Sequence, residues 1–156
     1  MSETLAPRLE AYLAGLLGAG DLRVSNLSRI PGGASRETYR FRARYARDGK
    51  AVERAMILRR DPSASLIETE RETEFRAYRA FHALGLPVPE PIALESDGRH
   101  LERPFFVMEE IENCQVGSIL TPDPYGANRE KIGGQLFTLL RRTAGSDAVA
   151  TGRAYF

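Results

Sequence analysis

The sequence predicts an α+β fold built on a five-stranded antiparallel sheet, with one helix inserted after the third strand and one helix near each end. Strand-like segments separated by short turn signals occupy residues 22–60 and 87–111. Between these regions and toward both ends, apolar residues return at the three- and four-residue spacing of an amphipathic helix. A chain of 156 residues, 42% of them hydrophobic, suffices for one domain-sized core.

The first helix is expected within residues 1–20. Leu9, Leu13 and Leu16 recur at helical spacing, and glycines at the end of the stretch stop the helix. Arg8 and Glu10 interrupt the apolar residues, and the stretch has no basic start, so it is unlike a signal peptide. No segment reaches the roughly twenty apolar residues that a membrane span needs.

Composition limits the partners that the chain is expected to have. The formal net charge of +1 gives no overall field that would draw the chain to nucleic acid or to an anionic membrane, so neither is expected. The single cysteine, Cys114, excludes an internal disulfide and a multi-cysteine metal site. A reducing compartment fits this cysteine usage, and we expect a cytoplasmic location.

Three strands are expected after the first helix. Residues 22–30 form the first strand, and after the break at Pro31 residues 38–45 alternate as a half-buried second strand does. The Asp48-Gly49 pair signals a tight turn, and residues 51–60 rise into the apolar run of a buried third strand. Short turns make these strands antiparallel neighbours.

The period changes after the third strand. A helix begins at about Ile67 and ends at Gly85, with Phe75, Tyr78 and Phe81 on one face. Residues 92–95 and 104–111 form a second hairpin, and a last helix covers residues 128–142. The chain thus divides into a sheet lobe over residues 1–111, a hinge and linker over 112–127, and the start of a second lobe over 128–156.

The glycine-rich turn before the second strand has two interpretations. Gly32 and Gly33 form an ordinary hairpin turn, or their backbone N–H groups approach a phosphate together with the Ser35 hydroxyl. The stretch lacks the third glycine of G-x-G-x-x-G and the G-K-[ST] of a P-loop. Taken alone, it favours the plain hairpin.

A cation and a carboxylate stand where a phosphate site would need them. Arg59, at the end of the third strand, could reach phosphates, although the neighbouring Arg60 leaves the register open by one residue. Glu74 lies on the following helix and could hold that cation in place. A solvated strand end and a solvated helical glutamate are the ordinary alternatives.

The last predicted strand runs into an irregular segment at "FFVMEEIEN". Backbone groups freed from the sheet there could bind the edge of an adenine, with Met108 closing the back of the pocket. In that geometry the Glu109 carbonyl and the Ile111 amide would meet the base. A core strand entering a loop explains the same residues equally well.

The order of these features is more specific than any one of them. In succession, "IPGGASRETYRFRA", "MILRRDP", "ETEFRAYRAFHALGLPVPEPIAL" and "PFFVMEEIE" resemble the aminoglycoside phosphotransferase and choline kinase-like family, in particular the kinase-like domains fused to acyl-CoA dehydrogenases. The resemblance implies the small lobe of a protein-kinase-like fold. Family members bind MgATP and phosphorylate a hydroxyl on a small molecule.

Carried over residue by residue, the resemblance assigns a nucleotide site. Arg59 takes the place where many relatives have lysine, and its planar fork still suits phosphate oxygens. Relatives often have a glycine just after the hinge, where this chain has "ENCQ". The assigned residues are Gly32, Gly33 and Ser35 in the nucleotide loop, Arg59 at the phosphates, Glu74 on the helix, and Met108, Glu109 and Ile111 at the hinge.

The residues that such a family uses for chemistry are not in this chain. The family pattern is an H-G-D-x-x-x-x-N run followed by a later metal-binding Asp, but neither His82 nor His100 begins an H-x-D here. Asp61 precedes a proline and is explained by turn chemistry. The resemblance therefore implies the N-terminal lobe only, inactive alone. We expect weak ATP binding, Mg bound only together with the missing lobe, and no catalytic or metal-binding residue in this chain.

Two other functions stay open. The chain could be a non-catalytic module that binds a nucleotide or a partner, with the apolar face of the last helix covered by the missing C-terminal lobe or by a second copy. Binding of nucleic acid would use the basic strand face, and it ranks last because aromatic residues alternate with the arginines. Those arginines are Arg40, Arg42, Arg44 and Arg47.

Overall fold

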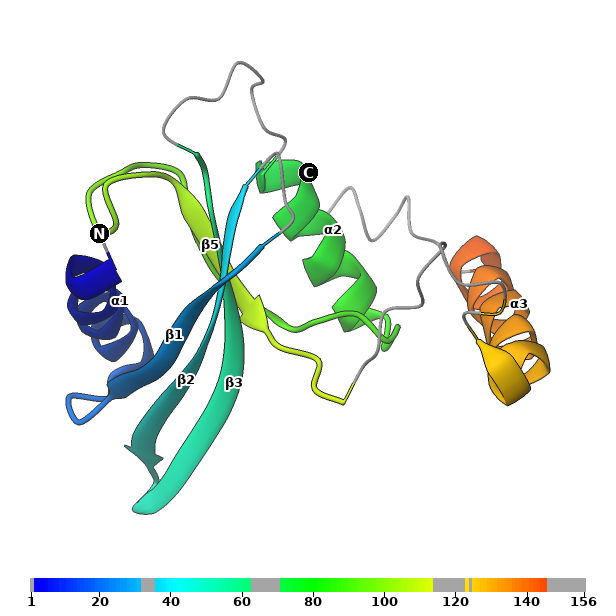
Figure 1. The fold of residues 1–156 in the computed structure, drawn as a ribbon, viewed down its shortest axis with the longest axis horizontal. Helices are drawn as coiled ribbons and strands as arrows, with labels where there is room; N and C mark the ends of the chain where they lie inside the picture. The colour runs from blue at the N-terminus through cyan, green and yellow to red at the C-terminus, as the bar shows by residue number, and fades with distance from the viewer. Residues whose placement is uncertain (1, 32–35, 63–70, 114–122, 124, 146–156) are drawn as a thin grey trace.

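The structure is a computed structural model that describes residues 2–31, 36–62, 71–113, 123 and 125–145 (Figure 1). Its five strands form one antiparallel sheet in the order β1-β2-β3-β5-β4, which confirms the predicted α+β architecture. The elements are α1 (Ser2–Leu17), β1 (Arg23–Ile30), β2 (Glu37–Arg47), β3 (Lys50–Arg60), α2 (Arg71–Ala83), β4 (Pro91–Glu95), β5 (Phe105–Glu109), the 3-10 turn η1 (Gly126–Asn128) and α3 (Arg129–Gly145).

The hairpin of β2 and β3 sets the register of the sheet. Asp48 and Gly49 both have positive φ, 52° and 73°, as a two-residue type I′ turn requires. The strands then pair along their full length, from Arg47 opposite Lys50 to residue 37 opposite residue 60. Because opposed residues share a face, this register decides which side of the sheet each arginine of β3 occupies.

One face of the sheet packs on α1 and holds the main core. Leu9 and Leu13 of α1 are fully buried against a layer that includes Phe41, Met56 and Phe105. Figure 1 shows α1 and α2 on opposite sides of the sheet. The alternation of β2 therefore behaves as predicted, because its aromatic residues enter the core with α1 and its arginines lie on the other face.

The opposite face of the sheet meets α2. The Phe75 and Tyr78 rings pack on the Phe106 ring, with centroids 6.0 and 6.4 Å apart. Arg71 is the first described residue of α2, and the predicted start near Ile67 lies outside the described residues. The acidic residues in the first turn of α2 stabilise its N-terminus.

The C-terminus of α2 is closed by a Schellman motif. The Leu86 N–H donates to the Phe81 carbonyl, and the Gly85 N–H donates to the His82 carbonyl. Gly85 has a φ of +66°, which a residue with a Cβ adopts only at a cost. The predicted stop at Gly85 is therefore confirmed, two residues past Ala83, the last helical residue.

The last helix, α3, lies to one side of the sheet and α2 (Figure 1). The Arg142 guanidinium donates to the Gly85 carbonyl at 2.9 Å. Four large apolar side chains of α3 are exposed: Ile132, Leu136, Phe137 and Leu140. Most of the predicted linker over 112–127 lies outside the described residues, and the division of the chain at 111 and 127 stays a prediction.

Within the described part of the chain, no helix has the length and apolarity that crossing a bilayer demands.

Candidate functional site

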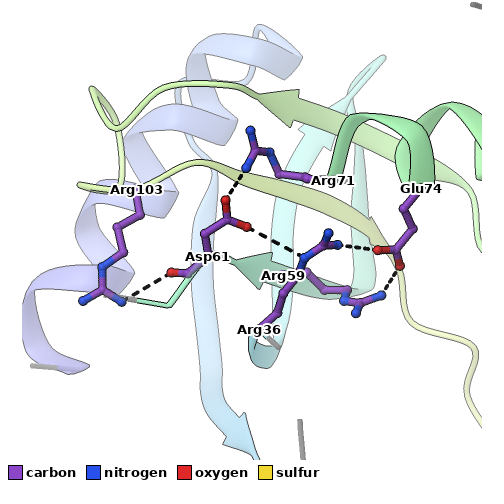
Figure 2. Close-up of polar contacts among 6 residues, drawn as sticks. All are labelled: Arg36, Arg59, Asp61, Arg71, Glu74 and Arg103. Atoms are coloured by element: carbon purple, nitrogen blue, oxygen red, sulfur yellow. Dashed lines mark hydrogen bonds and ion pairs between the residues drawn. The ribbon is translucent and has the colours of Figure 1, made fainter. Parts of the chain in front are cut away.

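Arg59 of β3 and Glu74 of α2 form an ion pair on the face of the sheet that α2 covers. The Arg59 Nη1 donates to the Glu74 Oε1, and the two side chains are 23% and 28% exposed. The predicted contact between the strand cation and the helix carboxylate is present (Figure 2). Its role toward a nucleotide stays a prediction.

Arg60 points to the other face and has a different environment. Its guanidinium donates to the Glu37 carboxylate at 2.7 Å and to the Leu101 carbonyl at 3.3 Å, and it lies over the Tyr39 ring. The register that the sequence left open by one residue is thereby decided. Arg59 faces α2, whereas Arg60 belongs to the layer that packs on α1.

Arg36, just before β2, binds the second oxygen of the same Glu74 carboxylate. Its Nη1 donates to the Glu74 Oε2, and its Nε lies 3.8 Å from the Asp61 Oδ1 (Figure 2). The Arg36 side chain is only 6% exposed. Nothing in the sequence singled out Arg36, because its partners lie 25 and 38 residues further along the chain.

Asp61 and Arg71 complete this group of charges. The Arg71 guanidinium donates to the Asp61 Oδ2, and the Asp61 N–H donates to the Pro104 carbonyl at 3.0 Å. Asp61 therefore does more than the turn before a proline requires, which the sequence did not show. We call Arg36, Arg59, Asp61, Arg71 and Glu74 the arginine cluster.

The arginine cluster stands over one aromatic ring and carries excess positive charge. The guanidinium carbons of Arg36 and Arg59 lie 5.6 and 5.5 Å from the centroid of the fully buried Phe106 ring. Three guanidinium groups face two carboxylates, which leaves one formal positive charge. Among the described atoms, Arg71 Nε and Asp61 Oδ1 are buried without a hydrogen bond. The arginine cluster therefore suits an anion that accepts paired hydrogen bonds from a guanidinium group, such as a carboxylate or a phosphate.

An apolar strip continues this face toward the end of β5. Ile57 pairs with Met108 across β3 and β5, two residues from the pair of Arg59 with Phe106. Alternate residues of a strand share a face, so Met108 and Ile57 lie beside the cluster. The role predicted for Met108, at the back of an adenine pocket, stays a prediction.

The chain leaves the sheet one residue later than β5 itself ends. The Glu109 N–H donates to the Glu90 carbonyl at 2.9 Å, and the Glu110 N–H donates to the Ala55 carbonyl at 3.0 Å. Ile111 follows, with 48% of its surface exposed. The roles predicted for the Glu109 carbonyl and the Ile111 amide stay predictions.

The basic residues of β2 on this face are tied to the same segment. Arg40 forms an ion pair with Glu110 at 3.5 Å, and Arg42 donates to Glu112. This hydrogen bond raises the pKa of Arg42 and lowers the pKa of Glu112. Two of the four arginines offered as a nucleic-acid surface are therefore paired with carboxylates.

The three residues assigned to the nucleotide loop, Gly32, Gly33 and Ser35, lie outside the described residues. Arg36, the first described residue after them, belongs to the arginine cluster. Within the described ranges, no group of three or more His, Cys, Asp or Glu side chains lies together as a metal site would need.

A sequence model of the phosphotransferase enzyme family matches residues 26–156. The chain belongs to this family.

The curated relatives are much longer than this chain. Acyl-CoA dehydrogenase family member 10 of Mus musculus is 30% identical over 145 residues, which is 92% of this chain and 13% of the relative. Acyl-CoA dehydrogenase family member 11 of Homo sapiens is 27% identical over 133 residues, 84% of this chain and 16% of the relative. The chain thus spans about a seventh of the curated relatives it matches.

A crystal structure shares the fold. It is of a Ralstonia eutropha JMP134 protein provisionally assigned as an aminoglycoside phosphotransferase, with a TM-score of 0.64 and 22% identity. The match covers 94% of this chain and 40% of that chain. The phosphotransferase family and the kinase-like fold predicted from the sequence are both confirmed.

Two cavities of the chain lie away from the arginine cluster. They have volumes of about 520 and 590 Å³, and Tyr12 and Leu16 of α1 line both. Burial and the hydrogen bond to Glu95 raise the pKa of Tyr12. None of the residues lining these two cavities belongs to the cluster. We place the candidate site at the cluster because it pairs a strand cation with a helix carboxylate, as protein-kinase sites do.

Proposed function

We propose that this chain is the nucleotide-binding lobe of an ATP-dependent phosphotransferase that phosphorylates a hydroxyl of a small molecule. The observation that carries the proposal is the ion pair between Arg59 of β3 and Glu74 of α2. Kinase-type sites need a strand cation and a helix carboxylate assembled in this way. Membership of the phosphotransferase family supports it.

The face of the sheet below α2 has the chemistry that ATP requires. Arg59 offers a planar fork of N–H donors to the phosphate oxygens. Ile57 and Met108 supply an apolar surface for adenine on the same face, and the chain turns out of the sheet after Glu110. The positive excess of the arginine cluster favours a polyanionic ligand.

As part of this proposal, the chain alone does not catalyse phosphoryl transfer. Neither histidine begins an H-x-D motif, so no residue of this sequence matches the catalytic Asp of the family. Catalytic residues, magnesium ligands and the acceptor pocket would come from a further lobe, and ATP affinity is therefore weak. The single cysteine supports a cytoplasmic location as part of the same proposal.

Thermal unfolding in a series of MgATP concentrations tests the proposal. With a dissociation constant of about 1 mM, about 10 mM MgATP adds about 1.4 kcal/mol to the free energy of unfolding. Arg59→Ala and Glu74→Gln should weaken binding about tenfold or more, because charge-assisted contacts are lost. Arg99→Ala is the matched control, since Arg99 is 81% exposed and pairs only locally with Asp97. Equal binding by all four proteins, or none by the wild type, would contradict the proposal.

A non-catalytic nucleotide- or partner-binding module is the second candidate. The exposed apolar residues of α3 favour it, because such a surface is ordinarily covered by another part of the protein or by a partner. The two candidates differ in self-association. Light scattering that shows a monomer over a wide concentration range would argue against a second copy as that partner.

A further inference from the structure

We infer that Arg36 is a positioning residue of the phosphate site, which holds Glu74 so that Arg59 can turn from that carboxylate to a phosphate. This inference rests on the proposed function, because it deepens the role given there to Arg59. Arg36 acts through Glu74 and does not itself contact the nucleotide.

The geometry of the shared carboxylate is the first ground for this inference. Arg36 binds Oε2 of Glu74, and Arg59 binds Oε1, so each guanidinium has an oxygen of its own (Figure 2). Either arginine can therefore leave without displacing the other.

The two arginines differ in exposure. The Arg36 side chain is 6% exposed, whereas the Arg59 side chain is 23% exposed. Arg36 also has a second carboxylate near it, since its Nε lies 3.8 Å from the Asp61 Oδ1. Arg36 is thus held in place from two sides, and Arg59 is the arginine that a ligand can reach.

Electrostatics gives the reason for two arginines at one glutamate. A half-buried carboxylate that loses its only cationic partner is strongly disfavoured, which would oppose any movement of Arg59 toward phosphate. With Arg36 in place, Glu74 keeps one charge-assisted hydrogen bond when Arg59 moves. The two guanidinium groups also repel each other over the Phe106 ring, and phosphate oxygens would relieve that repulsion.

Calorimetric binding of MgATP and of adenosine to the full chain separates this role from a merely structural one. Arg36→Gln should raise the dissociation constant for MgATP about tenfold, while the dissociation constant for adenosine changes by less than about twofold, within ordinary additivity error. Arg36→Lys should recover most of the loss, because an ammonium still neutralises Glu74. In the double variant with Arg59→Ala, Arg36→Gln should cause no further loss of MgATP affinity.

Arg60→Gln is the matched control. Arg60 is another buried arginine paired with a carboxylate, but it lies on the α1 face, so its loss should lower stability and leave MgATP affinity unchanged. If Arg36→Gln does not fold, Arg36→Lys carries the test. Its small effect on MgATP affinity should then vanish in a Glu74→Gln background, and an effect that persists there would overturn the inference.

The outcomes distinguish the two proposals. If Arg36→Gln binds MgATP like the wild type while Arg59→Ala binds it weakly, the inference about Arg36 is overturned and the proposed function stands. If Arg36→Gln loses MgATP and adenosine equally and Arg36→Lys does not rescue it, Arg36 is only structural and the inference is again overturned. If the wild type binds no MgATP, the proposed function fails and the inference fails with it.

Discussion

Glu37 joins two arginines on the α1 face of the sheet. It accepts from Arg60 at 2.7 Å and lies 3.3 Å from Arg103. Burial alone would raise the pKa of Glu37, but the hydrogen bond and charge of Arg60, with those of Arg103, outweigh burial and lower this pKa below its ordinary 4.5. The carboxylate therefore contributes stability above pH 4.5 that is lost as the pH falls through the lowered folded-state pKa.

We predict that Glu37→Gln lowers the free energy of unfolding by about 1–3 kcal/mol at neutral pH, because the charge-assisted hydrogen bond is lost. The difference from the wild type should shrink as the pH falls below 4.5. There Glu37 of the wild type takes up a proton, first in the unfolded chain and then, at its lowered pKa, in the folded one. Urea unfolding at several pH values measures both. Glu72→Gln is the control. It removes an exposed pair within one helix, worth about 0.5 kcal/mol or less, and one charge at the first turn of α2, worth about 0.3–1 kcal/mol. A pH-independent loss in Glu37→Gln would contradict this account.

Single residues also show how far the sequence could predict the site. The pair of Arg59 and Glu74 was predictable, because a strand end and the next helix lie together in any such fold. The choice between Arg59 and Arg60 was not, because one step of register moves a side chain to the other face. Arg36 was not predictable either, because a buried arginine is rare and depends on partners distant in sequence.

Among the elements, α2 carries Glu74 and depends on how its C-terminus is closed. Gly85 adopts a φ of +66° there, and nothing closer than 3.8 Å would meet an added Cβ. A substitution thus acts on the backbone conformation and not on packing. The sequence predicted this end well, because glycine followed by proline two residues later is a strong stop signal.

Gly85→Ala should lower the free energy of unfolding by about 1–2 kcal/mol, which is the cost of the left-handed conformation for a residue with a Cβ. Gly15→Ala is the opposite case, since Gly15 lies inside α1 with open space around it. There alanine should stabilise by about 0.5–1 kcal/mol. Chemical denaturation of the two variants measures the expected loss of stability in Gly85→Ala and the expected gain in Gly15→Ala. A loss of stability in Gly15→Ala would contradict the open space described around Gly15.

Strand and helix ends were predicted less closely than the elements themselves. The second strand extends to Glu37–Arg47, beyond the predicted 38–45, because the type I′ turn lets β2 and β3 pair up to Arg47 and Lys50. The last helix is Arg129–Gly145 and not 128–142. Pattern marks where apolar residues recur, whereas the backbone pairing that sets an end is not visible in sequence.

For the molecule as a whole, the apolar core and the charges divide between the two faces of the sheet. The core lies with α1, and the arginine cluster lies with α2 (Figures 1 and 2). The third helix belongs to neither, since four of its large apolar residues are exposed and only Leu139 is half-buried. This helix was predicted to need a cover for its apolar face, and nothing in the described residues covers Leu136, Phe137 or Leu140.

Amide hydrogen exchange should follow this division. We expect the amides of α3 to exchange at least about tenfold faster than those of α1, because few buried contacts oppose opening of α3. The leucines of α1 are buried, so α1 is the matched control of the same type of element. Mass spectrometry of peptic fragments, at a series of protein concentrations, measures the exchange rates of the two helices. Equal protection of both helices at low concentration would contradict the exposure of α3.

The Phe106 ring, which lies beneath the two arginines that share Glu74, has an optical consequence. The sequence contains no tryptophan, so its near-ultraviolet emission comes from tyrosine and phenylalanine. An indole introduced at Phe106 would be the single chromophore of its kind, in place of a ring whose centroid lies 5.6 and 5.5 Å from the guanidinium carbons of Arg36 and Arg59. Its fluorescence would follow the departure of a cation from the ring in real time, in a protein whose own spectrum is otherwise dark at those wavelengths.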